Sequence, residues 1–283
     1  MQLASVLYNS RPAIVAVRDG QHVLVRENAE LGVDSSFSEL VTEARSCDVV
    51  VGDEDLSWRS VVPNPCRIIC LGLNYRAHVE ETSRDLPTYP VLFTKWASSL
   101  TAAGAPVALP PESNQVDYEG ELAVIIGREG RRIAPADALD HVAGLSVAND
   151  ITMRDYQHRT HQWLQGKAWD ASTPLGPYLV TLEEVSDIGH LDLRLELNGQ
   201  EMQSSNTELL IFDVPTTIAR LSEFTTLQPG DVILTGTPGG VGARRDPPVF
   251  LTPGDVVRVE IPEVGILENP ITSEGAAQAP TDR

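Results

Sequence analysis

The sequence of 283 residues predicts an α+β fold, in which a small β-rich N-terminal domain precedes a larger domain made mostly of strands. The apolar runs are short and rich in β-branched residues, which is typical of strands. The chain contains 21 glycines and 20 prolines, a density that fits all-β and α+β folds with many turns. No regular alternation of strand and helix is visible, which disfavours a Rossmann fold or a TIM barrel.

Residues 1–62 are expected to form the small β-rich domain. Two β-type runs, at 4–10 and 12–27, open the chain, and Asp19-Gly20 within the second run is a typical hairpin turn. The opening segment lacks the basic start and apolar core of a signal peptide, so we expect a cytoplasmic protein.

A short helix is predicted at 36–46, because Ser36 can cap its N-terminus and Glu39 follows three residues later. The segment 61–67, VVPNPCR, then carries two prolines close together. We interpret it as the linker to the second domain.

Residues 66–273 are expected to form the larger domain. A helix is predicted over 214–226, where apolar residues recur at helical spacing. The last ten residues, 274–283, are interpreted as a flexible tail. The β-type runs of this domain are 66–73, 90–96, 120–127, 141–150, 176–181, 191–199, 231–236 and 256–262.

The chain carries 40 acidic and 21 basic residues, a formal net charge of −19. A field of this sign repels nucleic acids and anionic membrane surfaces, so neither is expected as a partner. It also repels a small anionic substrate, unless a cation or a basic pocket reverses the potential locally. No run is apolar enough to span a membrane, and the three cysteines lack the spacing of a zinc site.

Only two of the 21 basic residues are lysines, Lys95 and Lys167. A chain that uses arginine almost everywhere can keep lysine where a compact ammonium with a tunable pKa is needed. The alternative is a codon bias toward arginine, with the two lysines present by chance. Lys167 lies between Trp163 and Trp169, and an ammonium there can stabilise a developing negative charge.

Acidic residues in two segments can form a metal site. Glu119 and Glu121 are two apart in a predicted strand and point to one face, with Asp117 on that face as a further acid. Buried carboxylates at this spacing repel each other unless a cation lies between them, whereas a solvated strand face tolerates them. Asp150 follows an apolar run at a strand end. Three oxygen ligands, from Glu119, Glu121 and Asp150, suit Mg²⁺ or Mn²⁺ better than zinc.

His78 and Glu81 are three residues apart, so a helical turn puts them on one face. A carboxylate beside an imidazole raises its basicity and can produce a water-activating pair; an ordinary surface contact is the alternative. The glycine-rich turn at 234–242 matches no nucleotide-binding motif. Its N–H groups and the Thr237 hydroxyl can hold a carboxylate, although a simple tight turn has the same sequence.

Six segments in collinear order resemble the fumarylacetoacetate hydrolase family. They are LGLNYRAHVEE, PVLFTKW, DYEGELAVIIG, ANDITMRDYQ, QGKAWDASTPLGPYL and ILTGTPGGVG, and the resemblance extends from Cys66 to Ile271. It implies a mixed β-roll core, a homodimer and one divalent cation per subunit, Mg²⁺ or Mn²⁺. By the same resemblance, Glu119, Glu121 and Asp150 match the metal-binding carboxylates.

The resemblance also implies roles for individual side chains around the metal. Lys167 matches the active-site lysine of the family. Positions that contact the bound oxo-acid are matched by Arg154, Gln157 and Thr237. His78 and Glu81 match a dyad carried on a short mobile lid.

These roles together imply a metal-dependent hydrolase that cleaves a carbon–carbon bond in a 2,4-dioxo acid, such as fumarylpyruvate, and releases pyruvate. His78, supported by Glu81, would deprotonate the attacking water, while Lys167 and the cation would hold the pyruvate enolate. The lid region 81–89 would set side-chain specificity, with Arg84 as a candidate partner for a distal carboxylate.

Two other interpretations stand beside hydrolysis. The same enolate chemistry serves decarboxylation of oxaloacetate, decarboxylation of 2-oxo dioic acids in aromatic catabolism, and keto–enol or double-bond isomerisation of such acids. These reactions rank next, and the His78–Glu81 pair favours hydrolysis or decarboxylation over isomerisation alone. A non-catalytic binder of metal and oxo-acids would have lost a ligand or the dyad. All of those residues are present in this chain.

Overall fold

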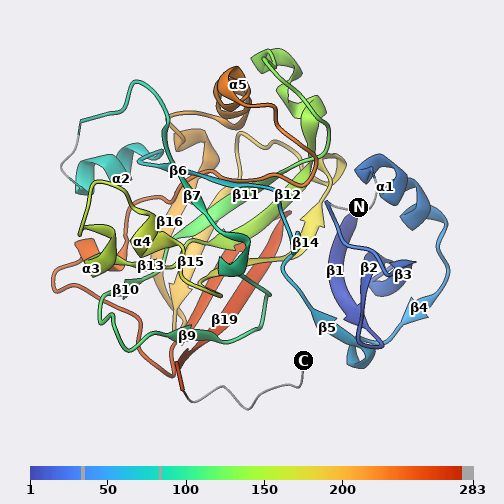
Figure 1. The fold of residues 1–283 in the computed structure, drawn as a ribbon, viewed down its shortest axis with the longest axis horizontal. Coiled ribbons are helices and arrows are strands. Elements are labelled where there is room, and N and C mark those ends of the chain that lie inside the picture. The colour runs from blue at the N-terminus through green and yellow to red at the C-terminus, as the bar shows by residue number, and fades with distance from the viewer. Residues whose placement is uncertain (33–35, 83–84, 276–283) are drawn as a thin grey trace.

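Strands dominate the structure, a computed structural model that describes residues 1–32, 36–82 and 85–275 (Figure 1). The predicted α+β class is confirmed. The α-helices are α1 (Phe37–Ser46), α2 (Arg76–Glu81), α3 (Arg154–Gln157), α4 (Leu164–Lys167) and α5 (Val214–Phe224). Short 3-10 turns are η1 (Asp53–Asp55), η2 (Ala97–Ser99), η3 (Pro135–His141), η4 (Leu182–Glu184), η5 (Thr207–Leu209) and η6 (Gly242–Arg244). The strands are β1 (Gln2–Tyr8), β2 (Arg11–Arg18), β3 (Gln21–Glu27), β4 (Val50–Val51), β5 (Leu56–Trp58), β6 (Ile68–Gly72), β7 (Val91–Lys95), β8 (Leu100–Thr101), β9 (Val107–Leu109), β10 (Val116–Asp117), β11 (Gly120–Ile126), β12 (Val142–Asn149), β13 (Thr152–Met153), β14 (Thr173–Val180), β15 (Asp192–Leu197), β16 (Gln200–Asn206), β17 (Val232–Leu234), β18 (Val256–Ile261) and β19 (Gly265–Ser273).

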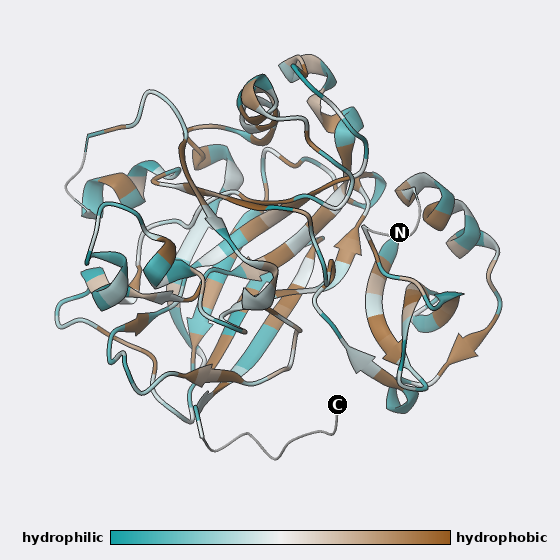
Figure 2. Cartoon of the chain, in the orientation of Figure 1, coloured by the Kyte–Doolittle hydropathy of each residue, from teal (hydrophilic) through white to brown (hydrophobic). Residues whose placement is uncertain are grey.

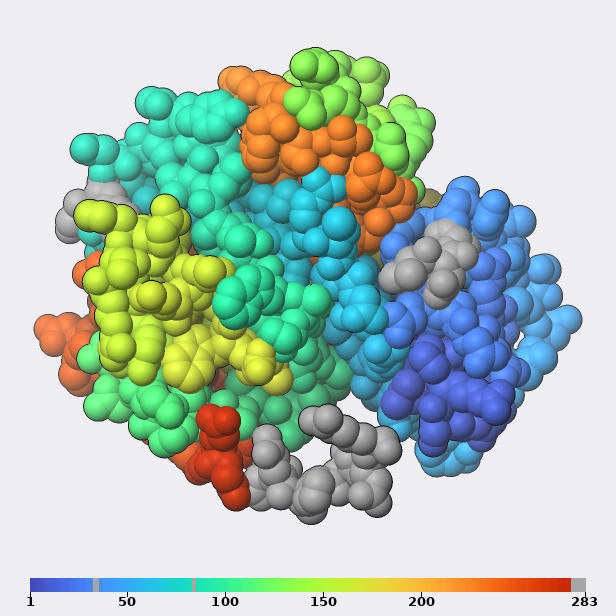
Figure 3. All heavy atoms as spheres, in the orientation of Figure 1, coloured from blue at the N-terminus to red at the C-terminus, as the bar shows by residue number. Residues whose placement is uncertain are grey.

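The larger sheet is mixed. Its order in the described residues is β4-β3-β2-β1-β14-β12-β11-β17-β6-β7, with β17 parallel to β6 and the other neighbours on this path antiparallel. β1 joins the sheet by pairing Gln2 with Val180 and Leu3 with Leu179 of β14. The N-terminal strands therefore extend the central sheet at one edge, where Figure 3 shows them as a separate lobe. The domain division at residues 62 and 66 stays a prediction.

Strand β11 is buried over its whole length, because both faces of the sheet are covered there. Leu122 and Val124 pack in a core shared with the second sheet, of order β16-β15-β18-β19-β9. Ala123 and Ile125 point the opposite way, into a core that helix α1 helps to form. Figure 2 shows brown, apolar stretches along the central strands, with white and teal stretches between them. Glu121 is therefore a buried carboxylate near the start of a strand whose other side chains are apolar and belong to the core.

The predicted N-terminal elements are confirmed. β2 and β3 form a hairpin whose turn residues, Asp19 and Gly20, both have positive φ, as a two-residue type I′ turn requires. Helix α1 follows Ser36, whose hydroxyl accepts a hydrogen bond from the Glu39 N–H.

Several elements carried no prediction because their local sequences are weak signals. β16 is mostly polar, β19 contains Pro270, and α3 and α4 have four residues each. Tertiary pairing produces them: β16 lies against β15, β19 against β18, and α3 packs against α4. Of the predicted tail, Glu274 still donates its N–H to Leu109, and residues 276–283 lie outside the described part. Within the described ranges, no helix is long and apolar enough to cross a bilayer.

Asn74 fixes the segment that leads from β6 into helix α2. Its buried amide Nδ2 donates to the carbonyls of Thr235, at 2.8 Å, and Phe212, at 3.0 Å. Its Oδ1 accepts from the Phe212 N–H at 2.8 Å. One side chain thus ties the start of α2 to the end of β17 and to the loop before α5.

We expect Asn74→Ala to lower the free energy of unfolding by about 2–4 kcal/mol, because it leaves buried backbone groups without partners. Chemical denaturation at fixed metal concentration measures this change. The control is Asn114→Ala, since Asn114 is exposed and surface changes typically stay within about 0.5 kcal/mol. Equal free energies of unfolding for the two variants would contradict a stabilising role of the Asn74 side chain.

Candidate active site

Three carboxylates meet where β11 begins and β12 ends. Glu119 directly precedes β11, Glu121 lies on it, and Asp150 directly follows β12. The register pairs Gly120 with Asn149, and the Asp150 N–H donates to the Glu119 carbonyl at 2.8 Å. One oxygen of each carboxylate lies within 4.8 Å of the others, and all three residues are buried. The structure thus brings together the three predicted metal ligands.

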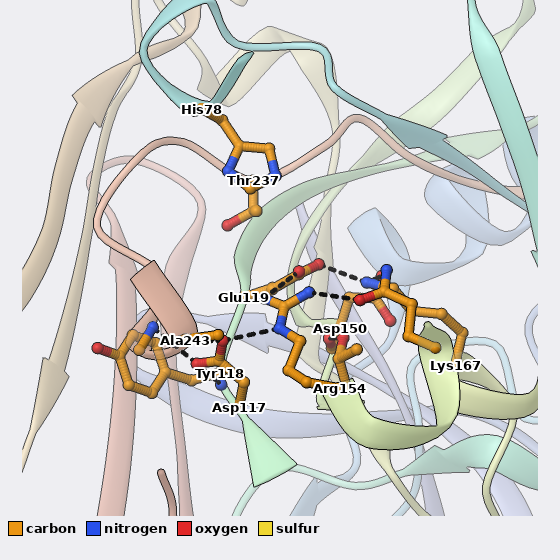
Figure 4. Close-up of polar contacts among 12 residues, drawn as sticks. His78, Asp117, Tyr118, Glu119, Asp150, Arg154, Lys167, Thr237 and Ala243 are labelled. Carbon is orange, nitrogen blue, oxygen red and sulfur yellow. Dashed lines mark hydrogen bonds and ion pairs between the residues drawn. The ribbon is translucent and has the colours of Figure 1, made fainter. Parts of the chain in front are cut away.

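Both lysines of the chain reach this group of carboxylates. Lys167 Nζ donates to Glu119 Oε2 at 2.5 Å and to Asp150 Oδ2 at 2.7 Å (Figure 4). Lys95, the last residue of β7, donates to Asp150 Oδ1 at 2.5 Å. The sequence predicts a site role for Lys167 alone, although the scarcity of lysine marks Lys95 equally.

The carboxylates differ in their electrostatic surroundings. Burial opposes ionisation of Glu119, but Lys167 and Arg154 outweigh it and lower the pKa of Glu119 to about 2. For Glu121, burial and the two neighbouring carboxylates raise the pKa well above its ordinary value. Its hydrogen-bond partner is the Gly236 N–H, 2.7 Å from Oε2. Glu121 is therefore the carboxylate whose negative charge is least compensated.

These residues fit a divalent cation. In the described residues, the group able to hold an ion offers carboxylate oxygens only, the hard ligands that Mg²⁺ and Mn²⁺ prefer. Together with Asp117, its carboxylates outnumber by one the buried cations of Lys95, Arg154 and Lys167. A divalent cation beside Glu121 would offset the repulsion that raises its pKa.

Helix α3 supplies a buried guanidinium next to the carboxylates. Arg154 Nε donates to Asp117 Oδ2 at 2.8 Å, and Nη2 forms an ion pair with Glu119 Oε1 at 2.6 Å. Burial opposes this charge, but Glu119 and Asp117 outweigh it and raise the pKa of Arg154. Nη1 donates to Gln157 Oε1 at 3.0 Å, which leaves the Gln157 amide nitrogen without a partner among the described residues. Both predicted substrate contacts on α3 therefore adjoin the predicted metal ligands.

The strand position of Asp117 predicts a further acid beside Glu119 and Glu121, but its carboxylate has other partners. Its carboxylate accepts from the N–H groups of Gly242, at 2.8 Å, and Ala243, at 3.0 Å, as well as from Arg154 (Figure 4). A Cβ at Gly242 would lie 1.9 Å from the Val249 carbonyl oxygen and 2.7 Å from Asp117 Oδ1, so only glycine fits. Asp117 thus anchors the glycine-rich loop to Arg154 and is absent from the group of potential metal ligands.

Thr237 lines the cavity from the same loop, but its hydroxyl is already engaged. It donates to the Gly120 carbonyl at 3.0 Å and accepts from Gln203 Nε2 at 2.9 Å. The Thr237 N–H has no partner among the described residues, so it is the donor available to a ligand. Gln203, which also accepts from the Gly120 N–H, lies on the unpredicted strand β16 and had no signal in the sequence.

The predicted His78–Glu81 pair is present on helix α2. His78 Nδ1 lies 2.7 Å from Glu81 Oε1. Glu81 Oε2 accepts from the Gly240 N–H at 2.9 Å, so the same carboxylate also holds α2 against the glycine-rich loop. In Figure 4, His78 and Thr237 lie on one side of Glu119, with Arg154 and Lys167 on the other.

A cavity of about 370 Å³ connects the two sides of the site. Phe93, Trp163 and Phe250 form apolar parts of its wall. This size and mixed lining are typical of a small-molecule site. The predicted site residues that line it are His78, Glu119, Glu121, Arg154, Gln157, Lys167 and Thr237. In the predicted specificity region 81–89, Ser83 and Arg84 lie outside the described residues.

Comparisons with known proteins point to one family. The family profile for fumarylacetoacetate (FAA) hydrolase, C-terminal, matches residues 67–272. Mitochondrial oxaloacetate tautomerase fahd2 of Xenopus laevis is 44% identical over 249 residues, which cover 87% of this chain and 78% of the relative.

Two solved structures extend the likeness to the fold. Fumarylacetoacetate hydrolase from Exiguobacterium antarcticum matches with a TM-score of 0.82 and 35% identity, over 96% of this chain and 99% of that one. The 5-carboxymethyl-2-hydroxymuconate delta-isomerase from Mycobacterium smegmatis matches with a TM-score of 0.79 and 31% identity, over 97% of this chain and 100% of that one. On the profile, the relative and the shared fold, the chain belongs to the fumarylacetoacetate hydrolase family.

Proposed function

We propose that this chain is a divalent-metal-dependent enzyme whose main reaction is the keto–enol tautomerisation of oxaloacetate or a closely similar 2-oxo dioic acid. The observation that carries the proposal is the buried group of Glu119, Glu121 and Asp150, three carboxylates beside a cavity that also contains Lys167 and His78. The name of the Xenopus laevis relative, an oxaloacetate tautomerase, supports the choice of reaction.

The proposed cofactor is one Mg²⁺ or Mn²⁺ per subunit, held by Glu119, Glu121 and Asp150. When bound, such a cation supplies Lewis-acid polarisation of the substrate's 2-oxo group and offsets the charge of its carboxylate. We assign binding of that carboxylate to the Gln157 amide and the Thr237 N–H, the two donors without partners described above.

Lys167 is the proposed electrostatic stabiliser. Burial disfavours its charge, but Asp150 and Glu119 outweigh burial and raise the pKa of Lys167. It therefore stays an ammonium at neutral pH and donates hydrogen bonds. Negative charge that develops on the substrate's 2-oxo oxygen, when the adjacent carbon loses a proton, is stabilised by this donor.

His78 is the proposed proton carrier. An ionised Glu81 accepts hydrogen bonds only, so Nδ1 of His78 carries the hydrogen and Nε2 has the lone pair. In the keto-to-enol direction, Nε2 takes the proton from the carbon next to the 2-oxo group, and Glu81 stabilises the resulting imidazolium. The imidazolium then gives this proton to the 2-oxo oxygen, which completes the enol and returns His78 to its neutral form. The enol-to-keto direction runs the same two transfers in reverse.

Hydrolysis of an acylpyruvate, which the sequence alone ranks first, is the second candidate. The His78–Glu81 pair favours it, because the same base can activate a water for attack on a 4-oxo group. The fumarylacetoacetate hydrolase among the structural relatives supports it as well. We rank tautomerisation above hydrolysis because the Xenopus laevis tautomerase has the higher sequence identity to this chain, 44% against 35% for the Exiguobacterium antarcticum hydrolase. Decarboxylation of oxaloacetate uses the same groups and is separated from both by the assay below.

The homodimer, the oxo-acid as partner and the cytoplasmic location remain proposals. The first two rest on the family resemblance. The location rests on the sequence alone, and the Xenopus laevis relative is named as mitochondrial. The charge of −19 supports the expectation that nucleic acids and membranes are not partners.

We expect the EDTA-stripped protein to bind one Mn²⁺ per chain in calorimetric titration. Asp150→Asn removes one carboxylate charge and should weaken this affinity at least about tenfold, as changes even around a metal ligand do. Asp170→Asn, the same chemical change at a position outside the carboxylate group, is the control. Wild-type affinity in Asp150→Asn, with unchanged thermal stability, would refute the metal site.

We expect the protein loaded with Mg²⁺ or Mn²⁺ to accelerate the loss of enol absorbance of oxaloacetate above the rate without protein. This loss should occur without stoichiometric release of pyruvate. Fumarylpyruvate and oxaloacetate are followed in parallel with a coupled pyruvate assay. Faster metal-dependent pyruvate release from fumarylpyruvate would move the assignment to the hydrolase, and from oxaloacetate to the decarboxylase. No metal-dependent reaction with either substrate would refute the proposal.

We expect His78→Gln to lower kcat by about 10²- to 10⁴-fold, the usual contribution of a general base, with Mn²⁺ affinity unchanged. Glu81→Gln should have a smaller effect, because glutamine can still accept from the Gly240 N–H. Glu80→Gln, at an exposed position of the same helix, is the control. Full kcat in His78→Gln would exclude it as the proton carrier.

A further inference from the structure

Arg244 is a cation that lines the active-site cavity but belongs to none of the site's ion pairs. The cavity's buried cations are engaged: Lys167 by Glu119 and Asp150, and Arg154 by Asp117 and Glu119. Arg244 is exposed, and its guanidinium has no hydrogen-bond or ion-pair partner among the described residues.

The backbone that carries Arg244 is firmly held. Arg244 is the last residue of η6, and the two residues before it donate their N–H groups to the buried carboxylate of Asp117. The next residue, Arg245, is tied by its side chain to the Tyr118 hydroxyl and to the Met202 carbonyl. The position of Arg244 at the cavity is thus fixed from both sides, while its guanidinium is left to a ligand.

The cavity lining combines buried and exposed groups of opposite charge. Glu119 and Glu121, beside the proposed cation, are buried, whereas Arg244 is exposed to solvent. Phe93 and Phe250 add apolar lining, which suits a short carbon chain. A substrate with a second carboxylate would carry extra negative charge into a protein of net charge −19.

We propose that Arg244 binds the distal carboxylate of dianionic 2-oxo acids and makes the enzyme prefer them to 2-oxo acids with a single carboxylate. The inference rests on the proposed function, because it takes the 2-oxo acid end to lie at the buried carboxylates. Guanidinium is suited to this role, since its planar donors match both oxygens of a carboxylate. Arg84, the candidate for such a contact on sequence grounds, lies outside the described residues.

The test uses two ligands of equal chain length, 2-oxoglutarate and 2-oxopentanoate, which differ only in the distal carboxylate. Their dissociation constants are measured by calorimetry with Mg²⁺-saturated protein. We expect the wild type to bind 2-oxoglutarate about five- to tenfold more tightly, between the worth of an exposed ion pair and that of a charged hydrogen bond. Arg244→Gln should remove this preference and leave the affinity for 2-oxopentanoate unchanged, and Arg244→Lys should retain part of it.

Arg11→Gln is the control, because it removes one exposed arginine charge on β2, away from the cavity. For oxaloacetate turnover, Arg244→Gln should raise KM with little change in kcat. An unchanged preference in Arg244→Gln, or an equal loss for both ligands, would overturn the assignment of Arg244 alone. If the wild type binds neither 2-oxo acid, the proposed function fails and this assignment fails with it.

Discussion

Repulsion between buried carboxylates is the constraint on which the rest of the structure depends. The antiparallel register of β11 and β12 places Glu119 opposite Asp150, and the side-chain period of two adds Glu121 on the same side. Such a group is stable inside a protein only when cations surround it. The end of β7 and the short helices α3 and α4 supply them, which explains why four-residue helices with little intrinsic stability persist here.

The glycine-rich loop is the second organising feature, because three parts of the site attach to its backbone. Glu121 accepts from the Gly236 N–H, Glu81 from Gly240, and Asp117 from Gly242. The first belongs to the group of carboxylates able to hold an ion, the second to helix α2, and the third pairs with Arg154. A displacement of this loop therefore alters all three at once. The geometry of the candidate site is therefore set by backbone amides as well as by side chains.

The sequence predicted well those features that depend on local pattern. The hairpin at Asp19-Gly20, the cap at Ser36 and the i, i+3 pair of His78 and Glu81 follow from short-range rules, and the structure contains each of them. The grouping of Glu119, Glu121 and Asp150 came from the ligand chemistry of their carboxylates and from the family resemblance, and the structure brings the three together.

The remaining features depend on tertiary contacts that no local pattern encodes. Gln203 sits on a polar strand that forms only by pairing with β15, and its contacts to Gly120 and Thr237 cross a large distance in sequence. Asp117 has the strand parity of the glutamates, but Arg154 and the N–H groups of the glycine-rich loop determine where its carboxylate lies. The sequence around Lys95 is that of an ordinary strand end and does not indicate a partner. Its hydrogen bond to Asp150 is visible only in the folded structure.

The location of the lysines has a consequence for how the folded chain meets other reagents and enzymes. Both lysines are about 2% exposed and are enclosed by carboxylates at the site. The surface of this protein therefore presents no lysine amine to acylating enzymes, to tagging systems that mark proteins for degradation, or to amine-directed cross-linkers. Covalent marking of its lysines requires that the candidate site open first.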